Sequence, residues 1–90
     1  MKKPKLKIVE GNKYWILNGN FHRIYGPAVE HASGYKMWYL NGLLHRIDGP
    51  AIESANGEKE WWLNGKQVKA EDVINYNITE REYIKFVINL

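Results

Sequence analysis

The stretch MWYLNGLLHRIDGPAIESANG, residues 37–57, occurs almost verbatim earlier in the chain and begins again later. An offset of 23 residues aligns three copies of its first part without insertion or deletion. The residues that coincide three times are Gly11, Gly34 and Gly57; Lys13, Lys36 and Lys59; Trp15, Trp38 and Trp61; and Leu17, Leu40 and Leu63. The second part, His-Arg followed by Gly-Pro-Ala and Glu, coincides twice, over residues 22–30 and 45–53. A fixed period of this length indicates a repeat architecture.

Each copy is predicted to form a β-hairpin at an Asn-Gly pair. The three pairs are Asn18-Gly19, Asn41-Gly42 and Asn64-Gly65, and each follows aromatic and β-branched residues that favour strands. Asn-Gly is typical of a type I′ turn because both central residues of that turn need a positive φ. The Gly-Pro that follows interrupts the outgoing strand, since proline has no N–H to donate. The pattern therefore predicts an antiparallel meander from about residue 6 to residue 67.

Alternation along the strands predicts which side chains share a face. The expected core is a row of repeated residues on one face: Trp15, Leu17, Trp38, Leu40, Trp61 and Leu63. We expect Val29 and Ile52 to fill the space between these tryptophans. The opposite face carries Tyr14, Ile16, Met37, Tyr39 and Trp62. This face is too apolar to be left fully solvated, and the C-terminal residues are predicted to cover it.

The C-terminal residues 68–90 leave the repeat and are predicted to form a helical cap. Residues 70–75 are expected to be a short helix, and Thr79 with Glu82 forms a capping box for a second helix from about residue 80. Apolar residues also alternate with other residues over the last positions, which is typical of a strand, so both alternatives stay open there. The predicted fold class is α+β, mostly β. It comprises a basic arm or edge strand (1–10), two and a half hairpin repeats (11–67) and the helical segment (68–90).

The composition limits the classes of protein. Ninety residues form one domain with a thin core, so burial against a second copy would stabilise it and a homo-oligomer is predicted. There is no cysteine, which excludes disulfides and thiolate sites. No apolar run approaches the roughly 20 residues of a membrane span, and the Lys-rich start lacks the apolar stretch of a signal peptide. We therefore expect a cytoplasmic protein that does not enter a membrane.

The charges are distributed unevenly along the chain. Residues 1–46 contain eight Lys and Arg against two acidic residues, whereas residues 47–90 contain five against eight. This asymmetry is compatible with the steering of an anionic ligand or with copies that meet head to tail. Chance clustering on a solvated surface is the alternative.

The two His-Arg pairs are the candidate ligand-binding residues. With a neighbouring aromatic ring, the set predicted to bind an anion is His22, Arg23, His45, Arg46 and Tyr39. Arginine offers a forked donor to phosphate or carboxylate, and histidine adds charge or stacking. The structural alternative is that each histidine packs beside a tryptophan and bonds a backbone carbonyl. In that alternative each arginine pairs with the glutamate seven residues later, Glu30 or Glu53.

Catalysis and metal binding are not predicted. The sequence contains no H-E-x-x-H, no Gly-rich phosphate loop and no nucleophile with a nearby base, and two related histidines are too few ligands for zinc. No catalytic residue, metal or cofactor is therefore assigned. Binding of single-stranded nucleic acid remains an alternative, because Lys2, Lys3, Lys5 and Lys7 form a basic arm and exposed aromatics stack bases. The acidic second half counts against it.

The W-x-L-N-G-x-x-H spacing at this period resembles the MORN repeat. The longer pattern W-x-L-N-G-x-x-H-R-x-x-G-P-A is similar to a MORN-like variant found in phages, large DNA viruses and some bacteria, and the resemblance covers about residues 11–66. It implies hairpins stacked into an elongated, twisted, single-layer sheet and a phage-like provenance. Lysine and arginine stand where MORN repeats usually have glycine, at Lys13, Lys36, Lys59, Arg23 and Arg46. The lipid and partner binding proposed for MORN proteins is therefore not carried over.

The predicted function is that of a small non-catalytic binding protein. By analogy with phage proteins of this size, it is expected to bind a host protein or to sequester a small anionic, nucleotide-like ligand, for example to inhibit a bacterial defence. The residues predicted to form the protein interface are Tyr14, Tyr39, Trp62, Tyr83, Phe86 and Leu90. A structural self-assembly module and a single-strand-binding protein remain the alternatives.

Overall fold

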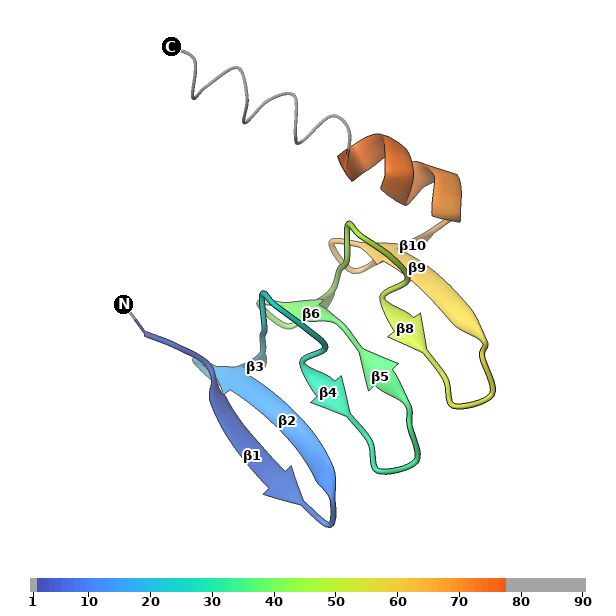
Figure 1. Cartoon of the computed structure of the whole chain (residues 1–90). Coiled ribbons are helices and arrows are strands. Elements are labelled where there is room, and N and C mark those ends of the chain that lie inside the picture. Colours follow the sequence, from blue (N-terminus) through green and yellow to red (C-terminus); the bar gives the residue numbers. More distant parts are fainter. Residues whose placement is uncertain (1, 78–90) are drawn as a thin grey trace.

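The computed structural model describes residues 2–77, which form mostly antiparallel β-sheet with one short C-terminal helix (Figure 1). The strands are β1 (Lys5–Val9), β2 (Asn12–Leu17), β3 (Asn20–Phe21), β4 (Val29–Glu30), β5 (Lys36–Met37), β6 (Tyr39–Leu40), β7 (Leu43–Leu44), β8 (Ile52–Glu53), β9 (Lys59–Leu63) and β10 (Lys66–Val68). The helix begins at Ala70 and includes residues 70–77. The predicted α+β, mostly β class is confirmed. The alternatives for residues 80–90, and the interface candidates Tyr83, Phe86 and Leu90, lie outside the described residues.

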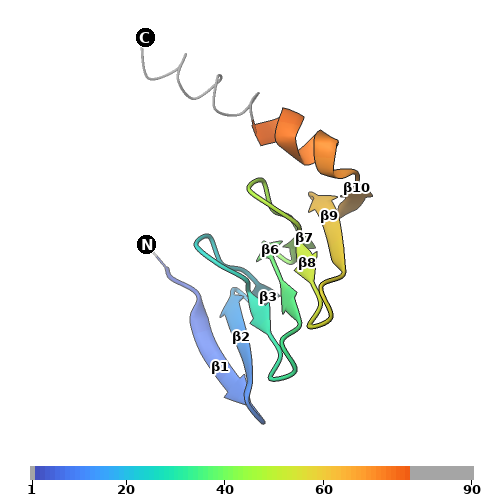
Figure 2. The same cartoon turned by 45° about the vertical axis from the view of Figure 1, so that its right-hand side comes forward.

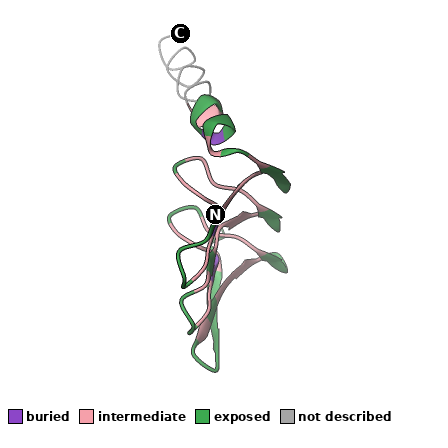
Figure 3. Cartoon of the chain, turned by 90° about the vertical axis from the view of Figure 1, so that its right-hand side faces the viewer, coloured by how far each residue is buried: buried purple, intermediate pink, exposed green. Residues whose placement is uncertain are grey.

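The strands follow one another across a single layer. Within residues 2–77, eight strands form one sheet in the order β1-β2-β4-β5-β8-β9-β10, with β3 beside β2, and β6 pairs with β7. All the pairs are antiparallel, as expected for a meander. Two views show β1 at one end of this layer and the helix beside β10 at the other (Figures 1 and 2). Seen edge-on, the layer is thin and little of it is fully buried (Figure 3).

The Asn-Gly pairs form the predicted tight turns. Their φ angles are 52° and 79° at Asn18-Gly19, and 50° and 81° at both Asn41-Gly42 and Asn64-Gly65. Both residues of each pair are thus left-handed, which is the requirement of a type I′ turn. Glu10 and Gly11 have similar angles, 51° and 81°, and join β1 to β2 in the same way. Glu10 therefore occupies a conformation that suits asparagine or glycine better.

Replacing Glu10 by asparagine is expected to stabilise the protein. The left-handed conformation costs an ordinary L-residue about 1–2 kcal/mol, and asparagine tolerates it, so we expect Glu10→Asn to raise the free energy of unfolding by about 1 kcal/mol. Urea denaturation followed by tryptophan fluorescence measures this change. The matched control is Glu58→Asn, which removes the same charge from another exposed turn. Equal stability of the two variants would contradict the prediction.

The strand register places Val29 and Ile52 on the face opposite the tryptophans. Residues directly opposite each other in neighbouring strands share a face. One such row crosses the sheet through Lys7, Tyr14, Val29, Met37, Ile52 and Glu60. The prediction that Val29 and Ile52 lie between the tryptophans is therefore wrong. Cross-strand neighbours are set by register, which alternation within each strand does not give.

Small residues fill the space between the tryptophans instead. Ala28 and Ala51 are 0% exposed, and their carbonyls accept hydrogen bonds from the backbone N–H groups of Trp15 and Trp38, both at 2.8 Å. The six predicted core residues are themselves half-buried. Within residues 2–77 the buried residues are Ala28, Val29, Ala51, Ile52 and Val73. The tryptophan rings are therefore partly accessible on their face of the sheet.

The helix packs against Trp61 of the last repeat, and it does not cover the face opposite the tryptophans. Val73 is 2% exposed, and it lines a small cavity of about 400 Å³ with Trp61 and Ile47. The Tyr76 ring contacts the ring of His45 at 5.8 Å between centroids. The predicted cover of the opposite face is therefore wrong for residues 70–77, because their apolar side chains meet the last repeat's tryptophan. No helix among the described residues has the length and apolar character to cross a membrane.

Candidate binding site on the tryptophan face

Each arginine of the His-Arg pairs lies over a tryptophan ring. The Cζ atom of Arg23 is 4.5 Å from the centre of the Trp15 ring, and that of Arg46 is 3.8 Å from the centre of the Trp38 ring. Both distances are within the range of a cation–π interaction. The loop after each arginine folds back, so that the guanidinium Nη1 donates to the carbonyl of the proline four residues later. These donor–acceptor distances are 3.2 Å in the first repeat and 2.9 Å in the second.

The glycine before each proline makes room for the arginine. A Cβ atom on Gly26 would lie 2.9 Å from Arg23 Cζ, and one on Gly49 would lie 2.8 Å from Arg46 Cζ. Such distances are too short for any side chain to replace the glycine without moving the arginine. The Gly-Pro pair therefore does more than interrupt a strand. It holds the guanidinium between bare backbone and an indole ring.

Carboxylates neutralise both guanidinium groups. Arg23 Nη1 lies 4.0 Å from Glu30, and Arg46 Nη1 lies 3.7 Å from Glu53. Arg46 Nε also donates to Asp48 Oδ1 at 2.8 Å. The side chains of Arg23 and Arg46 are 28% and 20% exposed. The structure thus has the arginine–glutamate pairs of the structural alternative. Within its own loop, Arg23 donates through Nη1, and Arg46 donates through Nε and Nη1.

The two histidines join neighbouring repeats. Nδ1 of His22 accepts a hydrogen bond from the backbone N–H of Asn41 at 2.9 Å, and Nδ1 of His45 accepts one from Asn64 at 3.0 Å. Each histidine thus contacts the Asn-Gly turn of the following repeat. The sequence suggested a bond to a backbone carbonyl, but the bonded group is an N–H. This contact requires an unprotonated Nδ1, because only a lone pair can accept.

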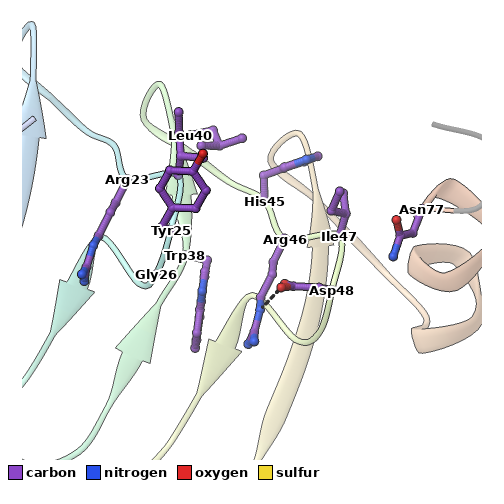
Figure 4. A pocket seen from close by; sticks show the side chains of 11 residues that line it. Arg23, Tyr25, Gly26, Trp38, Leu40, His45, Arg46, Ile47, Asp48 and Asn77 are labelled. Carbon is purple, nitrogen blue, oxygen red and sulfur yellow. Dashed lines mark hydrogen bonds and ion pairs between the residues drawn. The ribbon is translucent and has the colours of Figure 1, made fainter. Parts of the chain in front are cut away.

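An open groove lies between the two His-Arg loops (Figure 4). Its volume is about 700 Å³. The residues that line it are Arg23, Ile24, Tyr25, Gly26, Trp38, Leu40, His45, Arg46, Ile47, Asp48 and Asn77. Figure 4 shows the side chains of Arg23 and Arg46 in the two loops, with Arg46 bonded to Asp48. Three of the predicted anion-binding residues, Arg23, His45 and Arg46, are therefore brought together here, whereas His22 and Tyr39 are not among the lining residues.

The rim of the groove is apolar and strongly exposed. Tyr25 is 93% exposed and Ile24 is 68% exposed, both in the first loop. Sequence reasoning missed these two residues and Ile47, which is the counterpart of Ile24 in the second loop. The available signal was the isoleucine after His-Arg in both copies, a residue that no strand or turn requires there. Exposed apolar side chains beside a groove are typical of a surface that binds a partner.

The predicted interface residues Tyr14 and Tyr39 lie on the opposite face. They are linked through Phe21, whose ring centroid is 5.9 Å from that of Tyr14 and 5.3 Å from that of Tyr39. Burial, and to a lesser extent the neighbouring Tyr35, raise the pKa of Tyr39 above its ordinary value. Trp62 lies further along and donates from Nε1 to Glu60 at 3.2 Å. Tyr14 and Tyr39 thus form a packed aromatic cluster with Phe21.

Comparison with known proteins gives no match. No protein-family model, no curated protein and no solved structure matches this chain.

Proposed function

We propose that this protein is a small, non-catalytic binding protein, and that it binds an apolar segment of another protein in the groove between the His-Arg loops. The resemblance of the repeat to MORN-like proteins of phages supports a host protein as the partner. The sheet of stacked hairpins then serves as a rigid frame that presents two loops side by side. Binding to a host protein in this way suits an inhibitor of a host process, such as a bacterial defence.

The exposure of Ile24 and Tyr25 is the observation that carries this proposal. A tyrosine with 93% of its surface exposed contributes little to the fold. Aromatic side chains are enriched at the centre of protein interfaces, where they supply a large contact area. The groove beneath has further apolar surface from Leu40 and Ile47. A peptide side chain that enters it would contact both loops at once.

Both arginines already lie near carboxylates, which favours a protein over a small anion as the ligand of the groove. A phosphate would have to compete with Glu53 and Asp48 for Arg46, and with Glu30 for Arg23. Releasing the guanidinium would also cost its contact with tryptophan. The sequestration of a nucleotide-like ligand is therefore the weaker proposal. Titration of the same variants with inorganic phosphate and ATP tests it separately.

The test is selection of binding peptides from a displayed library of random sequences, with the full-length protein as bait. We expect apolar or aromatic peptides to be enriched. Their Kd, measured by isothermal titration calorimetry, is expected to weaken by about tenfold or more in the variant Ile24→Ser with Tyr25→Ser, because hot-spot anchors are lost. The matched control is Leu43→Ser, which removes an exposed apolar side chain from a hairpin tip outside the groove.

Two results would contradict the proposal. One is a failure to enrich any peptide whose binding depends on Ile24 and Tyr25. The other is binding of inorganic phosphate or ATP that is lost in Arg46→Ala and unchanged in Ile24→Ser with Tyr25→Ser. The second result would assign the groove to an anionic ligand. Circular dichroism spectra of each variant show whether the fold is retained.

A further inference from the structure

The first strand has an unpaired edge. Among the described residues, β1 pairs only with β2, so its other edge presents backbone N–H and C=O groups to solvent. All five residues of the strand are exposed. They include apolar side chains: Leu6 is 43% exposed, Ile8 59% and Val9 43%. Such an edge is a template on which a further strand can add.

The last repeat has the matching unpaired edge. In the two complete repeats, the start of β2 pairs with β4 and the start of β5 pairs with β8. In the third, the chain leaves β10 for the helix, and among residues 2–77 no strand lies beside Lys59 and Glu60 on the side away from β8. The sheet therefore ends in a half-repeat at each side. The last repeat lacks a strand beside Lys59 and Glu60, and β1 of another copy would supply one.

The charges at the two ends are complementary. The cross-strand row that contains Val29 and Ile52 begins with Lys7 on β1 and ends with Glu60 on β9. The four residues between them are uncharged, so the two charged residues of the row stand at its two ends. The first half of the chain is basic and the second half is acidic. Opposite charges directly across neighbouring strands attract.

We infer that the protein assembles end to end, with β1 of one copy added to the free edge of β9 in the next. The register of the inner repeats fixes the contacts at the two open residues of β9: Glu60 would face Lys7 of the other copy, and Lys59 would face its Ile8. The contact between Glu60 and Lys7 places opposite charges together. The row of alternating Lys and Glu on the tryptophan face, which runs through Lys13, Glu30, Lys36, Glu53 and Lys59, ends at this junction.

This contact is heterologous, so it leaves a free edge at both ends of every assembly. Assemblies of increasing length are therefore expected as the protein concentration rises, in place of a closed dimer. The ion pair is exposed, so the association is expected to weaken with added salt. Binding of a partner in the groove does not depend on this contact, because the groove is formed within one copy. Failure of the assembly would leave the proposed function unaffected.

Charge reversal tests the inference with the full chain. Lys7→Glu alone and Glu60→Lys alone are each expected to remain monomeric, because like charges then meet at the junction. A mixture of these two variants is expected to associate, because each end of one is complementary to an end of the other. The double variant Lys7→Glu with Glu60→Lys should associate like the wild type. Sedimentation velocity over a range of concentrations measures the mass, and Lys66→Glu is the charge-matched control.

Several results would overturn the inference. A wild type that stays monomeric at every concentration would do so, as would single variants that associate as well as the wild type. Failure of the mixed variants to associate would also do so, provided that circular dichroism shows both to be folded. Glu60 also accepts hydrogen bonds from Trp62 and Gln67. If Glu60→Lys does not fold, Lys7→Glu alone must still abolish the association of the wild type.

Discussion

Replacing Arg46 with alanine is expected to lower the free energy of unfolding by about 3 kcal/mol. The substitution removes the cation–π contact with Trp38, worth about 1–2 kcal/mol when shielded from water, and a charged donor to the Pro50 carbonyl, worth about 1.5–3 kcal/mol. It also leaves Glu53 without its partner. Lysine is not expected to rescue, since it lacks the flat guanidinium. Urea denaturation followed by fluorescence and circular dichroism measures the loss.

A double-mutant cycle with Gly49 shows whether this loss comes from the stacked position. Gly49→Ala places a Cβ where the guanidinium lies and is expected to displace it. In a chain that already carries Arg46→Ala, the same glycine substitution should cost much less, because nothing remains to displace. The two substitutions are therefore expected to be strongly non-additive. Additive losses, or a loss below about 0.5 kcal/mol for Arg46→Ala, would show that the stack does not stabilise the fold.

Replacing Val73 with aspartate is expected to detach the helix from the sheet. Val73 is 2% exposed against the last repeat, and burial of a valine side chain is worth about 1.5–3 kcal/mol. A carboxylate at this position must either be buried without a partner or move into water with its helix. We expect a loss of stability of about 2–3 kcal/mol and a weaker helical signal in circular dichroism.

The neighbouring residue supplies the control for this prediction. Ile74 lies at the edge of the same cavity but is 59% exposed, so Ile74→Asp makes a similar chemical change at a largely exposed position of the same helix. Its effect is expected to be within about 0.5 kcal/mol. Equal losses in the two variants would indicate that aspartate disturbs the helix itself. The helix would then not depend on its contact with the sheet.

The hairpins were predictable from the sequence because their cause is local. Each Asn-Gly pair specifies its own turn, and the repeat places three of them at equal spacing. The seven-residue spacing in the sequence also indicated the ion pairs of Arg23 and Arg46 with glutamates, as one of two alternatives. The stacking of these arginines on Trp15 and Trp38 was not, because it depends on the path of the Gly-Pro loop.

The errors concern relations between strands. Val29 and Ile52 were expected between the tryptophans, yet they lie in the row of Tyr14 and Met37. Residues 1–10 also depart from the repeat: a count of 23 would align Lys7 with Glu30, whereas the structure places Lys7 in the row of Val29. The reason is the two-residue turn at Glu10-Gly11, which replaces the longer turns that follow Glu30 and Glu53. A register shift of one residue turns every side chain of a strand to the other face. The face to which the helix would pack was likewise hidden, since both faces carry apolar residues.

The histidine contacts have a consequence for how the molecule changes in length. Through Nδ1, His22 and His45 each bind the turn of the adjoining hairpin, 19 residues along the chain. Duplication of a 23-residue segment would thus add one more such link and leave the earlier ones intact. Folding energy in such an array accumulates stepwise from nearest neighbours, so gene duplication can set the span of the ribbon without redesign of its interior.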